Sequence, residues 1–181
     1  MIKNLPNIMT MINISLGSLA VILLLDNNHD GVLLPAAFII AGGIIDGLDG
    51  KVARWLKAES EMGKQLDSLA DLITFGIAPV CLFISTDLLS LGVSGYSALI
   101  FYPVCGAFRL ARYNVESCNK SFTGVPITVC GMSLAVLRLA CESYHVATMN
   151  LSGLLAVVIF ICSLLMISRI KVPRLNHKNC A

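Results

Sequence analysis

Long apolar runs divide the chain into six segments, separated by short stretches of polar and charged residues. Each run approaches the roughly 20 residues that a helix needs to cross a hydrocarbon core about 30 Å thick. The pattern therefore predicts an all-α integral membrane protein with six transmembrane helices in a single domain over residues 1–181. The predicted spans cover residues 8–25, 32–55, 63–85, 91–113, 124–146 and 151–170.

The composition supports this fold class and removes several alternatives. Hydrophobic residues make up 56% of the chain, charged residues 13%, and the mean hydropathy is +0.81, which argues against a soluble globular protein. A net charge of +2 gives no basic field for binding nucleic acid. The seven cysteines form no CxxC pair and lie mostly in apolar runs, so neither a disulfide framework nor a zinc site is indicated.

The positions of Lys and Arg predict how the spans are oriented. With six spans both termini lie on one side, and twelve of the thirteen basic residues fall at that same face. The positive-inside rule makes this face cytoplasmic in a cell inner membrane. The exception is Arg138, one helical turn before Glu142, which we expect to pair with that residue or to extend toward the outer surface. The twelve are Lys3, Lys51, Arg54, Lys57, Lys64, Arg109, Arg112, Lys120, Arg169, Lys171, Arg174 and Lys178.

Four aspartates lie in or beside the second and third spans, near the predicted cytoplasmic face. Asp46 and Asp49 are three residues apart on one helix, and Asp67 and Asp71 are four apart on the next, so each pair shares a helix face. One ionised aspartate in mid-span costs about 2.5–3.5 kcal/mol on insertion scales. Four such groups need a compensating positive charge.

Oxygen ligands at this density suit Mg²⁺, Mn²⁺ or Ca²⁺ rather than zinc or copper. Two divalent ions would neutralise four carboxylates, so we predict a dimetal site between the two helices. A single aspartate here could instead end a helix or pair with Arg54, Lys57 or Lys64. Intramembrane carboxylates also occur in cation or proton transporters, where they lie near the midplane on broken helices.

The carboxylate region resembles the complete signature of the CDP-alcohol phosphatidyltransferases. Its nine positions read Asp46-x2-Asp49-Gly50-x2-Ala53-Arg54-x8-Gly63-x3-Asp67-x3-Asp71. Three further stretches resemble the bacterial members of this family that use serine as acceptor and are unrelated to phospholipase D. These are residues 75–79, 109–114 and 122–126.

The resemblance implies a six-helix fold, usually dimeric, which binds CDP-diacylglycerol at the cytoplasmic face. A hydroxyl of L-serine would attack the phosphorus linked to diacylglycerol and release CMP. By position in the signature, Asp46 and Asp67 would bridge both metal ions, Asp49 would bind the first, and Asp71 would bind the second. Asp71 would also accept the serine hydroxyl proton as general base.

The same resemblance implies contacts to the CDP moiety from Gly50, Arg54 and Ser60, with Asn7 and Thr10 as further nucleotide contacts. A glycine lets the nucleotide approach the backbone, and a guanidinium can bind phosphate through two parallel hydrogen bonds. Ser60 and Thr10 could instead only cap helices.

The carboxylate of a serine substrate needs a cation in this acidic site, and Arg112 and Arg109 on the fourth span are candidates, with Arg112 preferred. Both could instead be ordinary positive-inside anchors. Asn114 could hydrogen-bond serine or cap its helix.

Two other functions remain open at this point. Glycerol 3-phosphate or an inositol phosphate could be the acceptor in the same chemistry, although a phosphorylated acceptor demands additional cationic residues. A covalent phosphatidyl-enzyme is disfavoured because His29, His145 and His177 never form the HxK pattern of the phospholipase D type.

Overall fold

The computed structural model describes residues 5–26, 31–56, 60–84, 86–115, 122–144, 148–168 and 171–172. Within these ranges, the side chains of residues 53, 54, 87, 122, 123, 148–150, 171 and 172 are not described. The side chain of Arg54 therefore lies outside the described part of the chain. So do six of the basic residues assigned to the inner face, namely Lys3, Lys57, Lys120, Arg169, Arg174 and Lys178.

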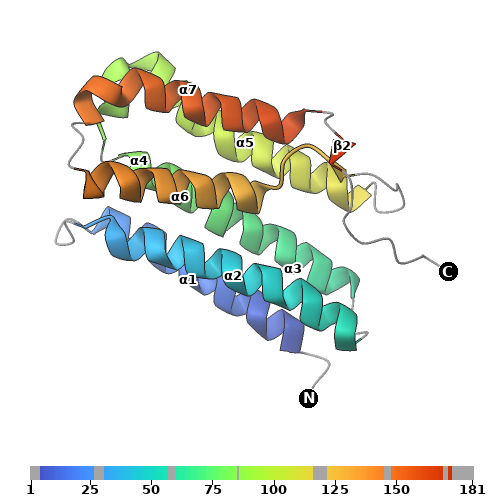
Figure 1. The fold of residues 1–181 in the computed structure, drawn as a ribbon. Coiled ribbons are helices and arrows are strands. Elements are labelled where there is room, and N and C mark those ends of the chain that lie inside the picture. Colours follow the sequence, from blue (N-terminus) through green and yellow to red (C-terminus); the bar gives the residue numbers. More distant parts are fainter. Residues whose placement is uncertain are drawn as a thin grey trace.

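Six helical segments run back and forth and pack side by side (Figure 1). They are α1 (Leu5–Leu25), α2 (Leu33–Leu56), the continuous segment α3 (Glu61–Asp71), η2 (Leu72–Ile77) and α4 (Ala78–Ile84), then α5 (Val93–Val115), α6 (Ile127–Ser143) and α7 (Thr148–Ile167). Each predicted end lies within three residues of the observed one. The first span, for example, was predicted to begin at residue 8, and α1 begins at Leu5. Figure 1 shows that α1 begins and α7 ends at the same end of the bundle.

Three short elements lie in the connections and were not part of the predicted pattern. A 3₁₀-helix, η3 (Asp87–Leu91), lies between α4 and α5. The strands β1 (Phe122–Thr123) and β2 (Lys171–Val172) pair antiparallel, with Phe122 opposite Val172 and Thr123 opposite Lys171. This pairing joins the connection before α6 to the segment that follows α7.

Three of the described helical segments are long and apolar enough to cross a membrane: Leu5–Leu25, Leu33–Val52 and Glu61–Ile84. A shorter apolar stretch covers Leu151–Ile167 in α7. The large apolar side chains at the bundle surface, such as Ile22, Ile100 and Leu154, are more than half exposed. Such a surface is suited to contact with lipid, because lipid tails are as apolar as these side chains.

The third helical segment widens into a π-helix directly after Asp71, and Pro79 supplies a physical reason. Proline has no N–H, so Pro79 cannot donate to the carbonyl of Phe75 four residues earlier, and its ring crowds that carbonyl. The hydroxyl of Tyr102 on α5 donates to Phe75 O instead, at 3.2 Å. Tyr102 and Phe75 are both fully buried, so α5 is fixed against the widened turn.

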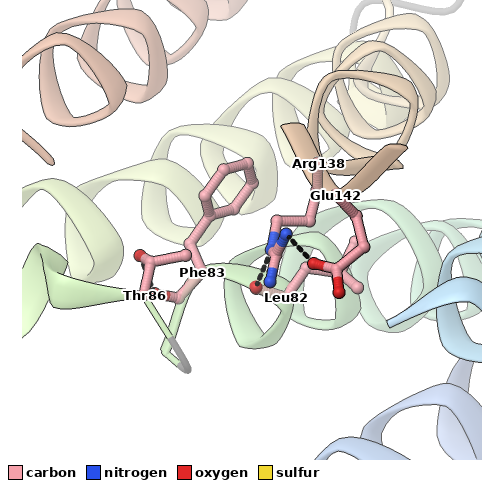
Figure 2. Close-up of polar contacts among 5 residues, drawn as sticks. All are labelled: Leu82, Phe83, Thr86, Arg138 and Glu142. Atoms are coloured by element: carbon pink, nitrogen blue, oxygen red, sulfur yellow. Dashed lines mark hydrogen bonds and ion pairs between the residues drawn. The ribbon is translucent and has the colours of Figure 1, made fainter. Parts of the chain in front are cut away.

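Arg138 confirms the predicted pairing with Glu142 and is itself buried. Its Nη1 donates to Glu142 Oε2 at 2.8 Å, and its Nε donates to the carbonyl of Leu82 at 3.3 Å (Figure 2). Leu82 lies in the last turn of α4. Arg138 therefore joins α6 to the end of α4, with its charge paired.

Candidate metal centre

Three of the four predicted aspartates meet at one point between α2 and α3. One carboxylate oxygen from each of Asp46, Asp49 and Asp67 lies within 4.8 Å of the other two. Asp49 is buried, while Asp46 and Asp67 are half-buried. The i, i+3 and i, i+4 spacings thus bring both helix faces together, as the sequence predicts. Several carboxylate oxygens this close together are a donor set for a hard divalent cation.

Asp71 lies beside this group and is almost fully buried. Its carboxyl interacts with those of Asp46 and Asp67, and also with the guanidinium of Arg109 on α5. Its Oδ1 makes no hydrogen bond to a residue that the structure describes. A buried carboxylate oxygen without a partner is costly in a protein interior, so Asp71 fits the role of an additional cation ligand.

Two threonine hydroxyls extend from other helices to the carboxylates. Thr10 Oγ1 on α1 lies 3.4 Å from Asp49 Oδ2, and Thr128 Oγ1 on α6 lies 3.3 Å from Asp46 Oδ2. Thr10 was predicted at the site from its position in the family pattern. The sequence analysis did not predict Thr128. The sequence feature that could have indicated it is its position in the first turn of a span, two residues after Pro126. These contacts bring α1, α2, α3 and α6 together around one polar centre.

A second polar group forms where α1 and α3 begin. Ser60 caps α3, since its Oγ accepts a hydrogen bond from the backbone N–H of Gly63 at 3.0 Å. A Cβ on Gly63 would lie 2.9 Å from Asn7 Oδ1, so a glycine is needed for α1 to approach this closely. Ser60 therefore caps α3, and Asn7 lies beside it.

Two further residues of the family signature, Gly50 and Arg54, lie on α2 beyond the aspartates. Gly50 is exposed, and a Cβ at this position would meet no other atom within 4 Å, so the backbone here faces open space. Arg54 follows one turn later on α2, with its side chain outside the described part of the chain.

The three candidate serine contacts on α5 differ in burial and in the residues with which they interact. Arg109 is buried and interacts with Asp71, whereas Arg112 is half-buried and lies one turn nearer the end of α5. Asn114 Nδ2 donates to Ser68 Oγ at 2.9 Å, and Lys64 Nζ donates to Asn114 O at 3.2 Å. Asn114 thus fixes the end of α5 against α3.

The comparisons with known proteins agree with this geometry. The family model described as CDP-alcohol phosphatidyltransferase matches residues 3–167. The chain is 39% identical over 170 residues to a Bacillus subtilis protein, covering 93% of this chain and 89% of that one. It is 36% identical over 169 residues to a Methanocaldococcus jannaschii protein, covering 93% and 73%.

A Mycobacterium leprae relative is 33% identical over 180 residues, which cover 95% of this chain and 59% of that protein. All three relatives are named CDP-diacylglycerol–serine O-phosphatidyltransferase. Since the family model covers almost all of the helical bundle and includes all four aspartates, this chain belongs to the CDP-alcohol phosphatidyltransferase family.

Proposed function

We propose that this protein transfers the phosphatidyl group of CDP-diacylglycerol to the hydroxyl of L-serine, giving phosphatidylserine and CMP. The observation that carries the proposal is the cluster of Asp46, Asp49 and Asp67, which come together from α2 and α3 within the region that the family model matches. The names of the relatives support serine as the acceptor.

The cofactor in this proposal is a pair of divalent metal ions, Mg²⁺ or Mn²⁺, with Ca²⁺ as a possible occupant. Asp46 and Asp67 would be shared between the ions, with Asp49 completing one site and Asp71 the other. Bound there, the ions would stabilise the negative charge that develops on phosphoryl oxygens during a displacement. The convergence of three carboxylates and the open Oδ1 of Asp71 support this donor set.

In the proposed reaction the serine Oγ attacks the phosphorus that carries diacylglycerol. A new P–O bond to serine forms as the P–O bond to CMP breaks, and the serine hydroxyl proton passes to Asp71. A carboxylate acts as general base only within hydrogen-bond reach of the proton that it accepts. The burial of Asp71 and the open lone pairs on its Oδ1 support this role.

For the serine carboxylate we propose Arg109 as the principal partner, with Arg112 as a secondary one. Of the two arginines, Arg109 is the buried one, and its positive charge acts electrostatically on Asp71. A serine bound between Arg109 and Asp71 would have its hydroxyl near the proposed base. A guanidinium can bind a carboxylate through two parallel hydrogen bonds. The hydrogen bond from Asn114 to Ser68 supports a positioning role for Asn114.

The CDP moiety would lie along Gly50, Arg54 and the polar group at the start of α3. The open space beside Gly50 and the proximity of Asn7 to Ser60 support this placement. Thr10, which reaches Asp49, would lie between the nucleotide and the metal ions.

We further propose that the single domain spans the cell inner membrane six times, with both termini and the metal centre on the cytoplasmic side. The distribution of Lys and Arg supports this orientation. A homodimer is proposed from the family resemblance, and the mass of the detergent-solubilised protein would test it.

The acceptor profile tests the function directly. The purified protein is given CDP-diacylglycerol, Mg²⁺ or Mn²⁺, and in turn L-serine, glycerol 3-phosphate or inositol 1-phosphate. We expect CMP release with serine and formation of phosphatidylserine. Release with a phosphorylated acceptor and not with serine would overturn the serine assignment. Absence of release with every acceptor, together with cation flux in vesicles containing the protein, would favour a transporter.

A further inference from the structure

Asn13, in the middle of α1, is a polar residue that the proposed reaction does not use. Its side chain is fully buried, and neither Oδ1 nor Nδ2 hydrogen-bonds to a residue that the structure describes. An unpaired buried amide destabilises a protein interior, because it loses its hydrogen bonds to water without replacing them. A helix packed among apolar side chains is thus expected to carry an apolar residue here unless the carboxamide has another role.

The neighbours of Asn13 place its carboxamide just beyond the metal centre. A Cβ on Gly42 would lie 2.8 Å from Asn13 Oδ1 and 2.8 Å from Thr74 Cγ2, so α2 and η2 both approach this side chain. Thr74 Oγ1 also donates to the backbone carbonyl of Asn13 at 3.0 Å. The side chain of Asn13 is therefore held between α2 and the π-helical turn.

Both of these neighbours lie one helical turn from an aspartate of the site. Gly42 precedes Asp46 by four residues on α2, and Thr74 follows Asp71 by three. Residues at these spacings are about 5–6 Å apart between their Cβ positions. On α1 itself, Asn13 follows Thr10 by three residues, and Thr10 reaches Asp49. The carboxamide thus lies one turn deeper in the bundle than the carboxylates.

Asp71 supplies an atom that matches this donor. Its Oδ1 is a buried acceptor with no hydrogen bond to a described residue, and Asn13 Nδ2 is a buried donor in the same condition. Because Thr74 contacts Asn13 and lies one turn from Asp71, a single water with two to four polar partners can bridge the two groups. The hydroxyl of Thr74 and the Oδ1 of Asn13 are further partners for such a water.

We propose that Asn13 is a positioning residue of the transferase. Its carboxamide hydrogen-bonds the Asp71 carboxylate, directly or through one water, and so holds that carboxylate toward the acceptor hydroxyl. This inference rests on the proposed role of Asp71 as general base. It does not depend on which alcohol is the acceptor.

A purely structural role makes a different prediction. Asparagine can join membrane helices through interhelical hydrogen bonds, and its loss then lowers stability. In this protein the carboxamide forms no such bond within the described part of the chain, so replacing it should not weaken helix packing. Activity and stability therefore respond differently under the two interpretations.

The test compares Asn13→Leu, which has the same branched shape without polar atoms, with wild type and with Ser163→Ala as control. Ser163 is also fully buried in a helix, and its hydroxyl donates only to the carbonyl of Ile159 among the hydrogen bonds described. The readouts are kcat and KM for CMP release, with whichever alcohol the wild type uses, and the melting temperature of the metal-free protein.

For Asn13→Leu we expect kcat to fall about 10- to 100-fold, which is the scale of a misplaced catalytic group. We expect KM for CDP-diacylglycerol to change less than about threefold, because the residue lies away from the nucleotide side. The melting temperature should stay the same or rise, and Ser163→Ala should keep the wild-type kcat. Gly42→Ala, which places a methyl group against Asn13 Oδ1, should reproduce the fall in kcat.

A kcat within about twofold of wild type in both Asn13→Leu and Gly42→Ala would overturn the proposal. A melting temperature of Asn13→Leu that falls in parallel with its activity would also overturn the proposal, because that result indicates that Asn13 is a structural residue. Wild-type activity with another alcohol and not with serine would contradict the proposed function and leave this test intact.

Discussion

Two regions of this protein hold charged side chains inside the helical bundle, and they treat charge in opposite ways. At the end of α4, Arg138 meets Glu142 at 2.8 Å and the carbonyl of Leu82 at 3.3 Å, so its positive charge faces a carboxylate and a carbonyl oxygen (Figure 2). Between α2 and the first half of the same helical segment, Asp46, Asp49 and Asp67 bring like charges together. The first region is electrostatically complete, while the second needs a cation.

This contrast separates structural from chemical use of charge. A paired charge stabilises the fold only modestly, because burying both ions offsets much of their attraction. A cluster of like charges opposes folding and is retained where binding or catalysis requires it. Substitutions in the two regions should therefore affect different quantities.

The largest effect should come from Asp71. Asp71→Asn keeps the shape of the side chain but removes its ability to accept the acceptor proton. General bases contribute about 10²- to 10⁴-fold, so we expect kcat to fall by that amount while CDP-diacylglycerol still binds. CMP release measures the first quantity, and equilibrium binding of CDP-diacylglycerol measures the second.

The matched control is Glu61→Gln, which removes one negative charge from the exposed first turn of α3. It should retain wild-type turnover. Near-normal turnover in Asp71→Asn would remove Asp71 as the base.

The next effect concerns cation binding and does not require turnover. Mg²⁺ or Mn²⁺ should raise the melting temperature of the wild type, because a ligand that binds only the folded state stabilises it by about 2.7 kcal/mol at 100 times its dissociation constant. Asp67→Asn removes a ligand that we place between both ions, so it should lose most of this shift. Glu61→Gln should keep the shift, and an unchanged shift in Asp67→Asn would argue against Asp67 as a ligand.

Arg109 and Arg112 offer a finer test on the acceptor side. A charge-assisted hydrogen bond contributes about 1.5–3 kcal/mol, so Arg109→Gln should raise KM for serine roughly 10- to 100-fold. Arg112→Gln, one turn nearer the end of α5, should raise it less than about fivefold. Serine titrations of CMP release measure both values. The reverse order would make Arg112 the principal serine contact.

The sequence predicted the helices well because the signal lies in long apolar runs, which the membrane requires. It also brought Asp46, Asp49 and Asp67 together, because their spacing along each helix defines a face. The π-helical turn was not predicted. Pro79 indicates that the helix must change, but the donor that replaces the missing N–H is Tyr102, from another helix.

Residues that complete the site across large sequence separations were also missed. Thr128 contacts Asp46 from 82 positions away, and no local pattern records such a pairing. The same limit applied to the arginines, since the sequence offers two cations one turn apart with equal chemistry. Their difference in burial and in electrostatic influence on Asp71 arises only from the packing of α5 against the rest of the bundle.

The smallest effects are expected at the paired region, and they should appear in stability alone. Arg138→Leu removes the charge-assisted hydrogen bond to Leu82 O and should lower the free energy of unfolding by about 1.5–3 kcal/mol, the usual contribution of a hydrogen bond from a charged group. Glu142 is 54% exposed at its side chain, so Glu142→Gln should cost about 1 kcal/mol or less. Unfolding in mixed detergent micelles measures both.

Both variants should keep the wild-type kcat per folded molecule, because Leu82 lies at the far end of the segment whose first half carries Asp67 and Asp71. A loss of turnover at unchanged stability would show that this ion pair communicates with the metal centre along the segment Glu61–Ile84. The two charged regions would then not differ in the way that we propose. An effect on stability alone would support it, because it would show that a buried charge whose partners are all supplied by the protein acts on folding and not on chemistry.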